Sequence, residues 1–132
     1  WDTLELLADE GVRYVADWVC DDMPFKIELP NGKEIYSLPY NFETNDVPGF
    51  MYRHYTTAEF EAVVRSQFDT LYREGASAAR VMALAIHPWQ IGLPHRISHL
   101  DSAFSYLFGH SDVWKATGSE ILDAYVNSGA VV

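Results

Sequence analysis

A short apolar run that ends at a histidine is the part of this sequence best suited to chemistry. Small and apolar residues follow Val81 up to His87, and Pro88 and Trp89 come directly after. The pattern is typical of a buried parallel strand that delivers a side chain to the carboxyl end of an α/β sheet or barrel. Because an imidazole titrates near neutral pH, His87 is our candidate general acid or base. Trp89 could form one wall of a pocket beside His87.

A second short apolar run ends in an acid and an aromatic residue. Residues 14–16 are followed by Asp17 and Trp18. Asp17 could orient the His87 imidazole and hold it protonated, as a carboxylate partner does in hydrolytic sites. Its alternative role is to cap a loop. Trp18 could line a ligand groove or simply belong to the core.

Other polar residues gather in two segments that we expect to be loops. Asp21 and Asp22 could bind a cation or the N–H groups of a substrate, although loop acids are commonly just solvated. Glu43, Asn45 and Asp46 could contact a substrate, or could serve only to shape a turn. The sequence alone leaves both alternatives open for each group.

We predict no metal site within this chain. His95 and His99 are spaced i, i+4 and would share one helix face, but no third ligand follows at a recognisable spacing. Glycine-rich nucleotide loops, zinc-protease, serine-hydrolase and paired-cysteine motifs are missing as well. The sequence therefore argues against those four classes of site.

Composition and charge narrow the choice of partner and compartment. The chain has 132 residues, and its net charge is −10, from 19 acidic and 9 basic residues. An acidic surface repels phosphate backbones, so we do not expect a nucleic acid partner. The single Cys20 cannot form an internal disulfide, and no signal peptide or bilayer-spanning apolar run is evident. We therefore predict a cytoplasmic protein that does not enter a membrane. Because Trp1 begins within a helical pattern, we also expect a fragment of a longer chain.

Periodicity predicts an α/β fold with a mostly parallel sheet. Helices are expected at residues 3–10, 57–75, 96–108 and 119–126. Strands are expected at 12–16, 80–86 and 113–116, with a hairpin formed by 26–29 and 34–38 around Asn31 and Gly32. Residues 39–51 are expected to form a long functional loop. A complete barrel of βα units needs about 200–250 residues, so the chain could be half of one.

Several of these segments, taken together, resemble one family. They look like the C-terminal half of a polysaccharide deacetylase domain (NodB homology, carbohydrate esterase family 4), in its allantoinase-like and peptidoglycan-deacetylase-like branch. The combination covers nearly the whole chain and is more specific than any single motif. The matching segments are residues 14–18, 21–25, 38–40, 44–46, 84–88 and 92–96.

The resemblance implies a fold, an activity and roles for residues. The fold would be the C-terminal part of a distorted (β/α) barrel with a β-hairpin insertion, and residues 1–132 would form part of a single domain. The activity would be hydrolysis of a non-peptide C–N bond, in an N-acetyl sugar or a cyclic ureide. His87 would be the general acid, Leu84 would line the acyl pocket, and Asp17 and Trp18 would tune the histidine and shape the groove.

The family's catalytic base and its metal-binding histidines belong to the N-terminal half of the domain. A divalent metal such as zinc would therefore be bound outside this chain, and none within it. His95 and His99 follow the His87 motif, which is the wrong place for the family's metal motif. We expect the chain to be inactive alone and completed by a longer chain, a second copy or a partner chain.

Two alternatives to an enzyme remain open on the sequence. The chain could be a non-catalytic module that binds a carbohydrate through Trp18, Trp89 and Tyr40. It could also be an oligomerisation module whose aromatic surface pairs with another chain.

Overall fold

The computed structural model of the protein describes residues 2–129, and Trp1, where a truncated start is expected, lies outside them. The chain divides into two compact units. The first comprises the described residues up to Tyr40 together with those from Lys115 onward, and the second is Asn41–Trp114. The elements, in chain order, are α1 (Thr3–Asp9), β1 (Tyr14–Val15), β2 (Phe25–Glu28), β3 (Glu34–Ser37), α2 (Asp46–Met51), α3 (Thr57–Gly75), α4 (Ile97–Phe108) and α5 (Gly118–Ser128).

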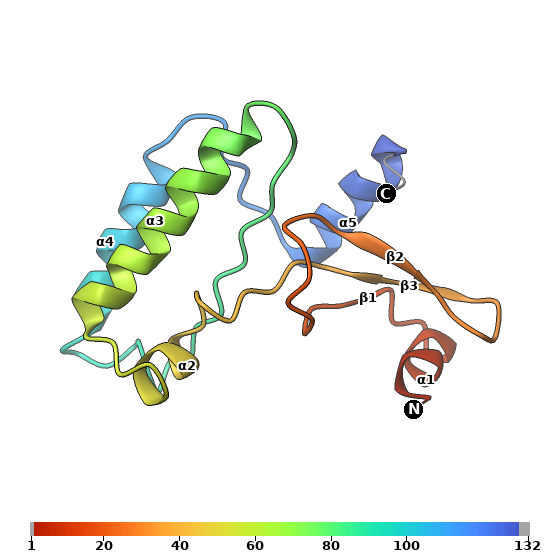
Figure 1. Ribbon diagram of the computed structural model, residues 1–132, viewed down its shortest axis with the longest axis horizontal. Coiled ribbons are helices and arrows are strands. Elements are labelled where there is room, and N and C mark those ends of the chain that lie inside the picture. Colours follow the sequence, from red (N-terminus) through yellow and green to blue (C-terminus); the bar gives the residue numbers. More distant parts are fainter. Residues whose placement is uncertain (1, 130–132) are drawn as a thin grey trace. The chain divides into compact units, whose positions relative to one another are not determined.

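The first unit is built on a three-stranded sheet with the order β1-β3-β2 (Figure 1). Strand β1 runs parallel to β3, and β2 runs antiparallel to it. The predicted hairpin is confirmed, because Gly32 takes a positive φ of 80° in its turn and Leu29 pairs with Lys33 there. Helix α5 belongs to the same unit, where Tyr125 meets the β3 residue Tyr36 edge to face.

The second unit consists of α2, α3 and α4, and α3 and α4 lie side by side (Figure 1). Helix α3 begins where the sequence predicts, since Thr56 and Glu59 form a capping box in which each side chain bonds to the backbone of the other. Apolar residues about four positions apart lie on one face of each helix, and these faces pack together in one core, as expected for amphipathic helices. The core residues are Phe50, Phe60, Val64, Phe68, Ile91, Leu100, Ala103 and Leu107.

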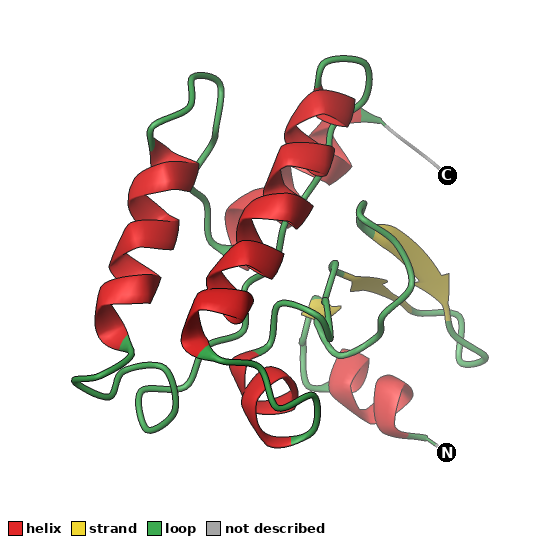
Figure 2. Ribbon diagram, turned by 60° about the vertical axis from the view of Figure 1, so that its left-hand side comes forward, coloured by secondary structure: helices red, strands yellow, loops and turns green. Residues whose placement is uncertain are grey.

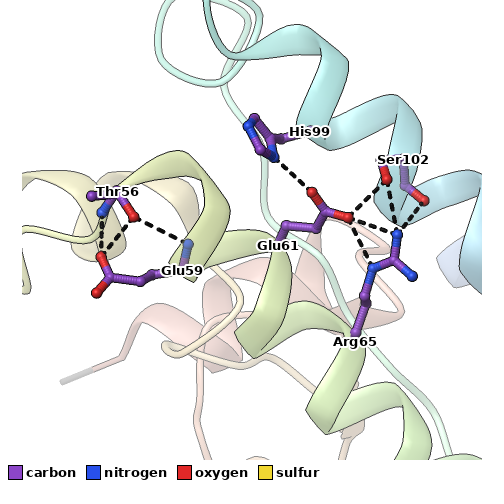
Figure 3. A network of polar contacts seen from close by, with 6 residues as sticks. All are labelled: Thr56, Glu59, Glu61, Arg65, His99 and Ser102. Carbon is purple, nitrogen blue, oxygen red and sulfur yellow. Dashed lines mark hydrogen bonds and ion pairs between the residues drawn. The ribbon is translucent and has the colours of Figure 1, made fainter.

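A polar network also joins α3 to α4 (Figure 3). Glu61 accepts hydrogen bonds from Arg65 at 2.7 Å and from the Ser102 hydroxyl at 2.8 Å, and its other oxygen lies 2.6 Å from His99 Nδ1. Burial of the Glu61 carboxyl acts to raise its pKa. The bonds from His99, Ser102 and Arg65, with the Arg65 charge, act in the opposite direction, and the pKa falls below 4.5.

Helices are predicted better than strands. All four predicted helices are present with ends within about two residues, which is the usual uncertainty of helix boundaries. The sheet, however, is mixed rather than mostly parallel. Within residues 2–129, regular strands are confined to this sheet, and neither 80–86 nor 113–116 is one of them (Figure 2). A strand is defined by its ladder, and residues 80–86 form only a single parallel bridge, between Ala85 and Asn45.

The long loop expected at 39–51 is the other correction. Its second half is the short helix α2, which Asn45 caps by accepting a hydrogen bond from Val47 N–H at 3.0 Å. Pro48 is compatible with helix here because it lies in the first turn, where a backbone N–H has no partner within the helix. No helix within residues 2–129 is both long and apolar enough to cross a membrane.

Candidate active site

His87 pairs with a carboxylate within the second unit. Its Nδ1 lies 2.6 Å from Oδ1 of Asp46, and its side chain is 38% exposed. An ionised carboxylate can only accept hydrogen bonds, so Nδ1 carries the proton in this pair. The tautomer follows: Nε2 is the nitrogen left to take or give a proton at the exposed edge of the ring.

Asp46 is the first residue of α2, and its side chain is 0% exposed. Its second oxygen, Oδ2, accepts the backbone N–H groups of His87 at 2.9 Å and of Ile91 at 3.2 Å. The carboxylate therefore holds both the imidazole and the turn that carries it. A buried carboxylate needs such partners, and Asp46 has three of them.

The backbone around Asp46 explains why this acid reaches His87. The residues on either side of Asn45 pair with Ala85: Asp46 N–H donates to the Ala85 carbonyl at 3.1 Å, and Ala85 N–H donates to the Thr44 carbonyl at 3.2 Å. The buried Thr44 hydroxyl adds a bond of 2.7 Å to the Ala83 carbonyl. These bonds align the start of α2 with the end of the apolar run, two residues before His87.

The turn after His87 is tightly closed. The His87 carbonyl accepts from Gln90 N–H at 2.8 Å and from Ile91 N–H at 3.1 Å. Trp89 is 59% exposed, and its ring centroid lies 5.4 Å from that of His87. An aromatic face that stands open beside the imidazole is available to a ligand.

The structure locates the other predicted residues without assigning them all a role. Leu84 is half-buried against the core of the second unit. Asn45 uses its side-chain oxygen to cap α2. Asp17, Trp18, Asp21 and Asp22 belong to the first unit. Asp17 and Trp18 are exposed, and Asp21 accepts a bond from Met23 N–H within its own loop. Their catalytic and binding roles remain predictions.

The sequence pattern does not link Asp46 to His87. It groups Asp46 with Glu43 and Asn45 in a loop, and it favours Asp17 as the partner of the imidazole. An N-capping asparagine before Asp46 and an apolar stretch after it do carry a helix signal. That signal could have placed Asp46 in the first turn of a helix, but not beside His87.

The residues present do not fit a metal centre. Across residues 2–129, no three His, Cys, Asp or Glu side chains are grouped so that they could hold a metal ion. His99, one of the two histidines with ligand spacing, bonds instead to Glu61.

Comparison with known proteins defines the class of this fold. No protein-family model matches the chain. Among solved structures, Puue allantoinase superposes with a TM-score of 0.88 at 28% identity, and a Pseudomonas aeruginosa PAO1 protein named as a polysaccharide deacetylase superposes with 0.86 at 28% identity. Each match covers 96% of this chain and 43% of the other. The fold is thus that of part of a deacetylase-type α/β barrel.

A curated relative supports the same assignment from sequence. The chain is 30% identical over 114 residues to a Schizosaccharomyces pombe (strain 972 / ATCC 24843) protein that carries the name polysaccharide deacetylase. The match covers 82% of this chain and 34% of that protein, so the chain spans about a third of the relative's length. The resemblance to the polysaccharide deacetylase superfamily and its allantoinase-like branch is confirmed.

Proposed function

We propose that this chain supplies the general-acid side of an active site that hydrolyses a non-peptide C–N amide bond. The observation that carries the proposal is the pair formed by the buried Asp46 and the half-exposed His87. It is supported by the names of the similar proteins, which are an allantoinase and polysaccharide deacetylases.

The chemistry assigned to His87 is proton delivery. Water adds its oxygen to the carbonyl carbon, the C–N bond breaks, and the leaving nitrogen takes a proton from Nε2 of the imidazolium. Asp46 holds the Nδ1–H and stabilises the positive charge before the transfer. The proton lost by the water goes to a base, and neither His87 nor Asp46 serves as that base.

We propose that this base, and any divalent metal, belong to the N-terminal half of the domain, as the resemblance to the family implies. We accordingly propose that this chain alone is inactive, and that a longer chain, a second copy or a partner chain completes the site. Hydrolysis by the isolated chain at enzyme-like rates would contradict this. A cytoplasmic location remains a prediction.

Two substrate classes fit the proposal, an N-acetylated sugar polymer and a cyclic ureide such as allantoin. Thr44, Asn45 and Asp46 each serve the backbone or His87 in the structure. They therefore do not favour one class over the other. Trp89, exposed beside the imidazole, suits either a sugar ring or a flat ureide.

The test is a pair of histidine variants in the complete enzyme, assayed on allantoin and on N-acetylglucosamine oligomers. His87→Ala should lower turnover by about 10²- to 10⁴-fold, the usual contribution of a general acid. His99→Ala is the matched control, because His99 has the same Nδ1–carboxylate distance of 2.6 Å and the same 38% exposure. It should leave turnover unchanged.

A loss of less than about tenfold in His87→Ala would remove this residue from the mechanism. If the complete protein binds sugar oligomers without turnover, and His87→Ala binds them equally well, the chain is part of a binding module instead.

A further inference from the structure

Arg96 joins two parts of the second unit through one side chain. Its Nη1 donates to the Gln90 side-chain oxygen at 2.6 Å and to the Gln90 carbonyl at 3.2 Å. Its guanidinium carbon also lies 4.3 Å from the centre of the Phe50 ring. Gln90 belongs to the turn after His87, whereas Phe50 belongs to α2.

Helix α2 thus holds the His87 turn at two points. Asp46 and Phe50 are four residues apart and lie on one face of α2. Asp46 accepts hydrogen bonds directly from the backbone of His87 and Ile91 in this turn. Phe50 contacts the turn indirectly, because Arg96 packs on the Phe50 ring and donates to Gln90. The contact through Arg96 holds Gln90, which lies between the two residues that Asp46 bonds.

The second attachment is rigid at both ends. Phe50 and Gln90 are each more than nine-tenths buried. Arg96 immediately precedes α4 and is tied to the preceding loop, because its backbone N–H bonds to the Leu93 carbonyl at 2.8 Å. The side chain therefore starts directly before a helix that packs on α3 and ends on a buried amide.

We propose that Arg96 is a positioning residue that fixes the His87 imidazole for proton transfer; this rests on the function proposed above. An arginine suits the task because its planar guanidinium can stack on an aromatic ring while its edge donates to two oxygens. A lysine at this position would keep the charge but could not stack and donate in the same way.

A second arginine with similar contacts serves as a control that separates a positioning role of Arg96 from a merely structural one. Arg65 lies 4.4 Å over the Tyr106 ring and donates 2.8 Å to the Ser102 hydroxyl, so it makes the same two kinds of contact. Its contacts join α3 to α4 and do not involve the His87 turn. Arg65→Gln should therefore destabilise the fold without altering His87.

The experiment compares Arg96→Gln, Arg96→Lys and Arg65→Gln in the complete enzyme by two readouts. The first is ¹⁵N NMR of the His87 imidazole, which reports its tautomer and the Nδ1 hydrogen bond. Arg96→Gln should weaken the Nδ1–H signature and mix the tautomers, Arg96→Lys should do so partly, and Arg65→Gln should resemble the parent. The second is steady-state kinetics, where Arg96→Gln should lower kcat by about 10- to 100-fold with little change in KM, as a misplaced catalytic group does.

Unchanged His87 resonances in both Arg96 variants would overturn the proposal, and so would an equal change in Arg65→Gln. If Arg96→Gln does not fold, Arg96→Lys alone decides by the same NMR criterion. A different result would show that the proposed function is wrong. In that case His87→Ala keeps full activity, whereas the Arg96 variants still change the NMR signals of His87.

Discussion

Replacing Asp46 with asparagine tests the pair at the centre of the site. The carboxylate accepts three N–H groups, one from the imidazole and two from the backbone of His87 and Ile91. Asparagine has nearly the same shape but only one accepting oxygen. That oxygen can serve the two backbone groups where Oδ2 now lies. The amide NH₂ then faces Nδ1 of His87.

The consequence for chemistry follows from the direction of that bond. An NH₂ group facing Nδ1 requires a bare nitrogen there, so the imidazole proton moves to Nε2. In the imidazolium form, which is the acid, Nδ1–H and the amide N–H would be two donors facing each other. The negative charge of the carboxylate, which balances the imidazolium, would also be missing. We expect turnover to fall by about 10²- to 10⁴-fold, which corresponds to about 3–5 kcal/mol in the barrier.

The consequence for stability is smaller. The backbone bonds persist but become bonds to a neutral group, so Asp46→Asn should lower the free energy of unfolding by about 1–3 kcal/mol. The assay pairs denaturant unfolding with turnover in the complete enzyme. Glu61→Gln is the control, because Glu61 makes an equally short bond of 2.6 Å to a histidine Nδ1 away from the site.

The reasoning would be refuted if Asp46→Asn kept turnover within tenfold of the parent, or if Glu61→Gln lost as much. Asp17→Asn belongs in the same series. If Asp17 rather than Asp46 governs His87, that variant alone will show the large kinetic loss.

Two further predictions concern the scaffold. A Cβ on Gly92 would lie 2.4 Å from the Pro88 carbonyl oxygen, so Gly92→Ala should distort the turn and reduce both turnover and melting temperature; Gly75→Ala is the control, since nothing lies within 4 Å there, and it should leave both unchanged. Because the Glu61 pKa is lowered in the folded state, the ionised Glu61 side chain stabilises the folded protein. This stabilisation is complete above the ordinary pKa of 4.5 and is lost as pH falls below that value. Urea unfolding as a function of pH should therefore show the parent losing its advantage over Glu61→Gln at acidic pH, and a constant difference down to pH values well below 4.5 would contradict this.

Local sequence signals predict the helices and the hairpin. Thr56 and Glu59 stand three residues apart before an apolar stripe, and each bonds to the backbone of the other in the structure. Thr117 and Glu120 repeat the arrangement at α5. Such caps act within one turn, so their effect is readable from neighbouring residues. The same holds for Gly32, whose positive φ the turn requires.

Long-range pairing is where the sequence was insufficient. The run that ends at His87 is apolar enough for a buried strand, yet its ladder depends on partners far away in the chain. Among the described residues it finds one bridge, to Asn45, forty residues earlier in the sequence. An apolar run favours an extended segment and leaves its neighbours unspecified, and here residues 80–85 are only half-buried and Ile86 is exposed.

The partner of His87 was missed for the same reason. Asp17 follows an apolar run just as His87 does, so local pattern alone favours it as the paired acid. Asp46 instead lies in a six-residue helix that covers only a small part of the core. The feature that brings Asp46 close to His87 is the bridge between Asn45 and Ala85, a long-range contact that no short sequence motif predicts. Because the same helix also presents Phe50 to Arg96, α2 is the element that orients the candidate acid. Substitutions on its buried face should therefore affect catalysis more than their distance from a substrate would suggest.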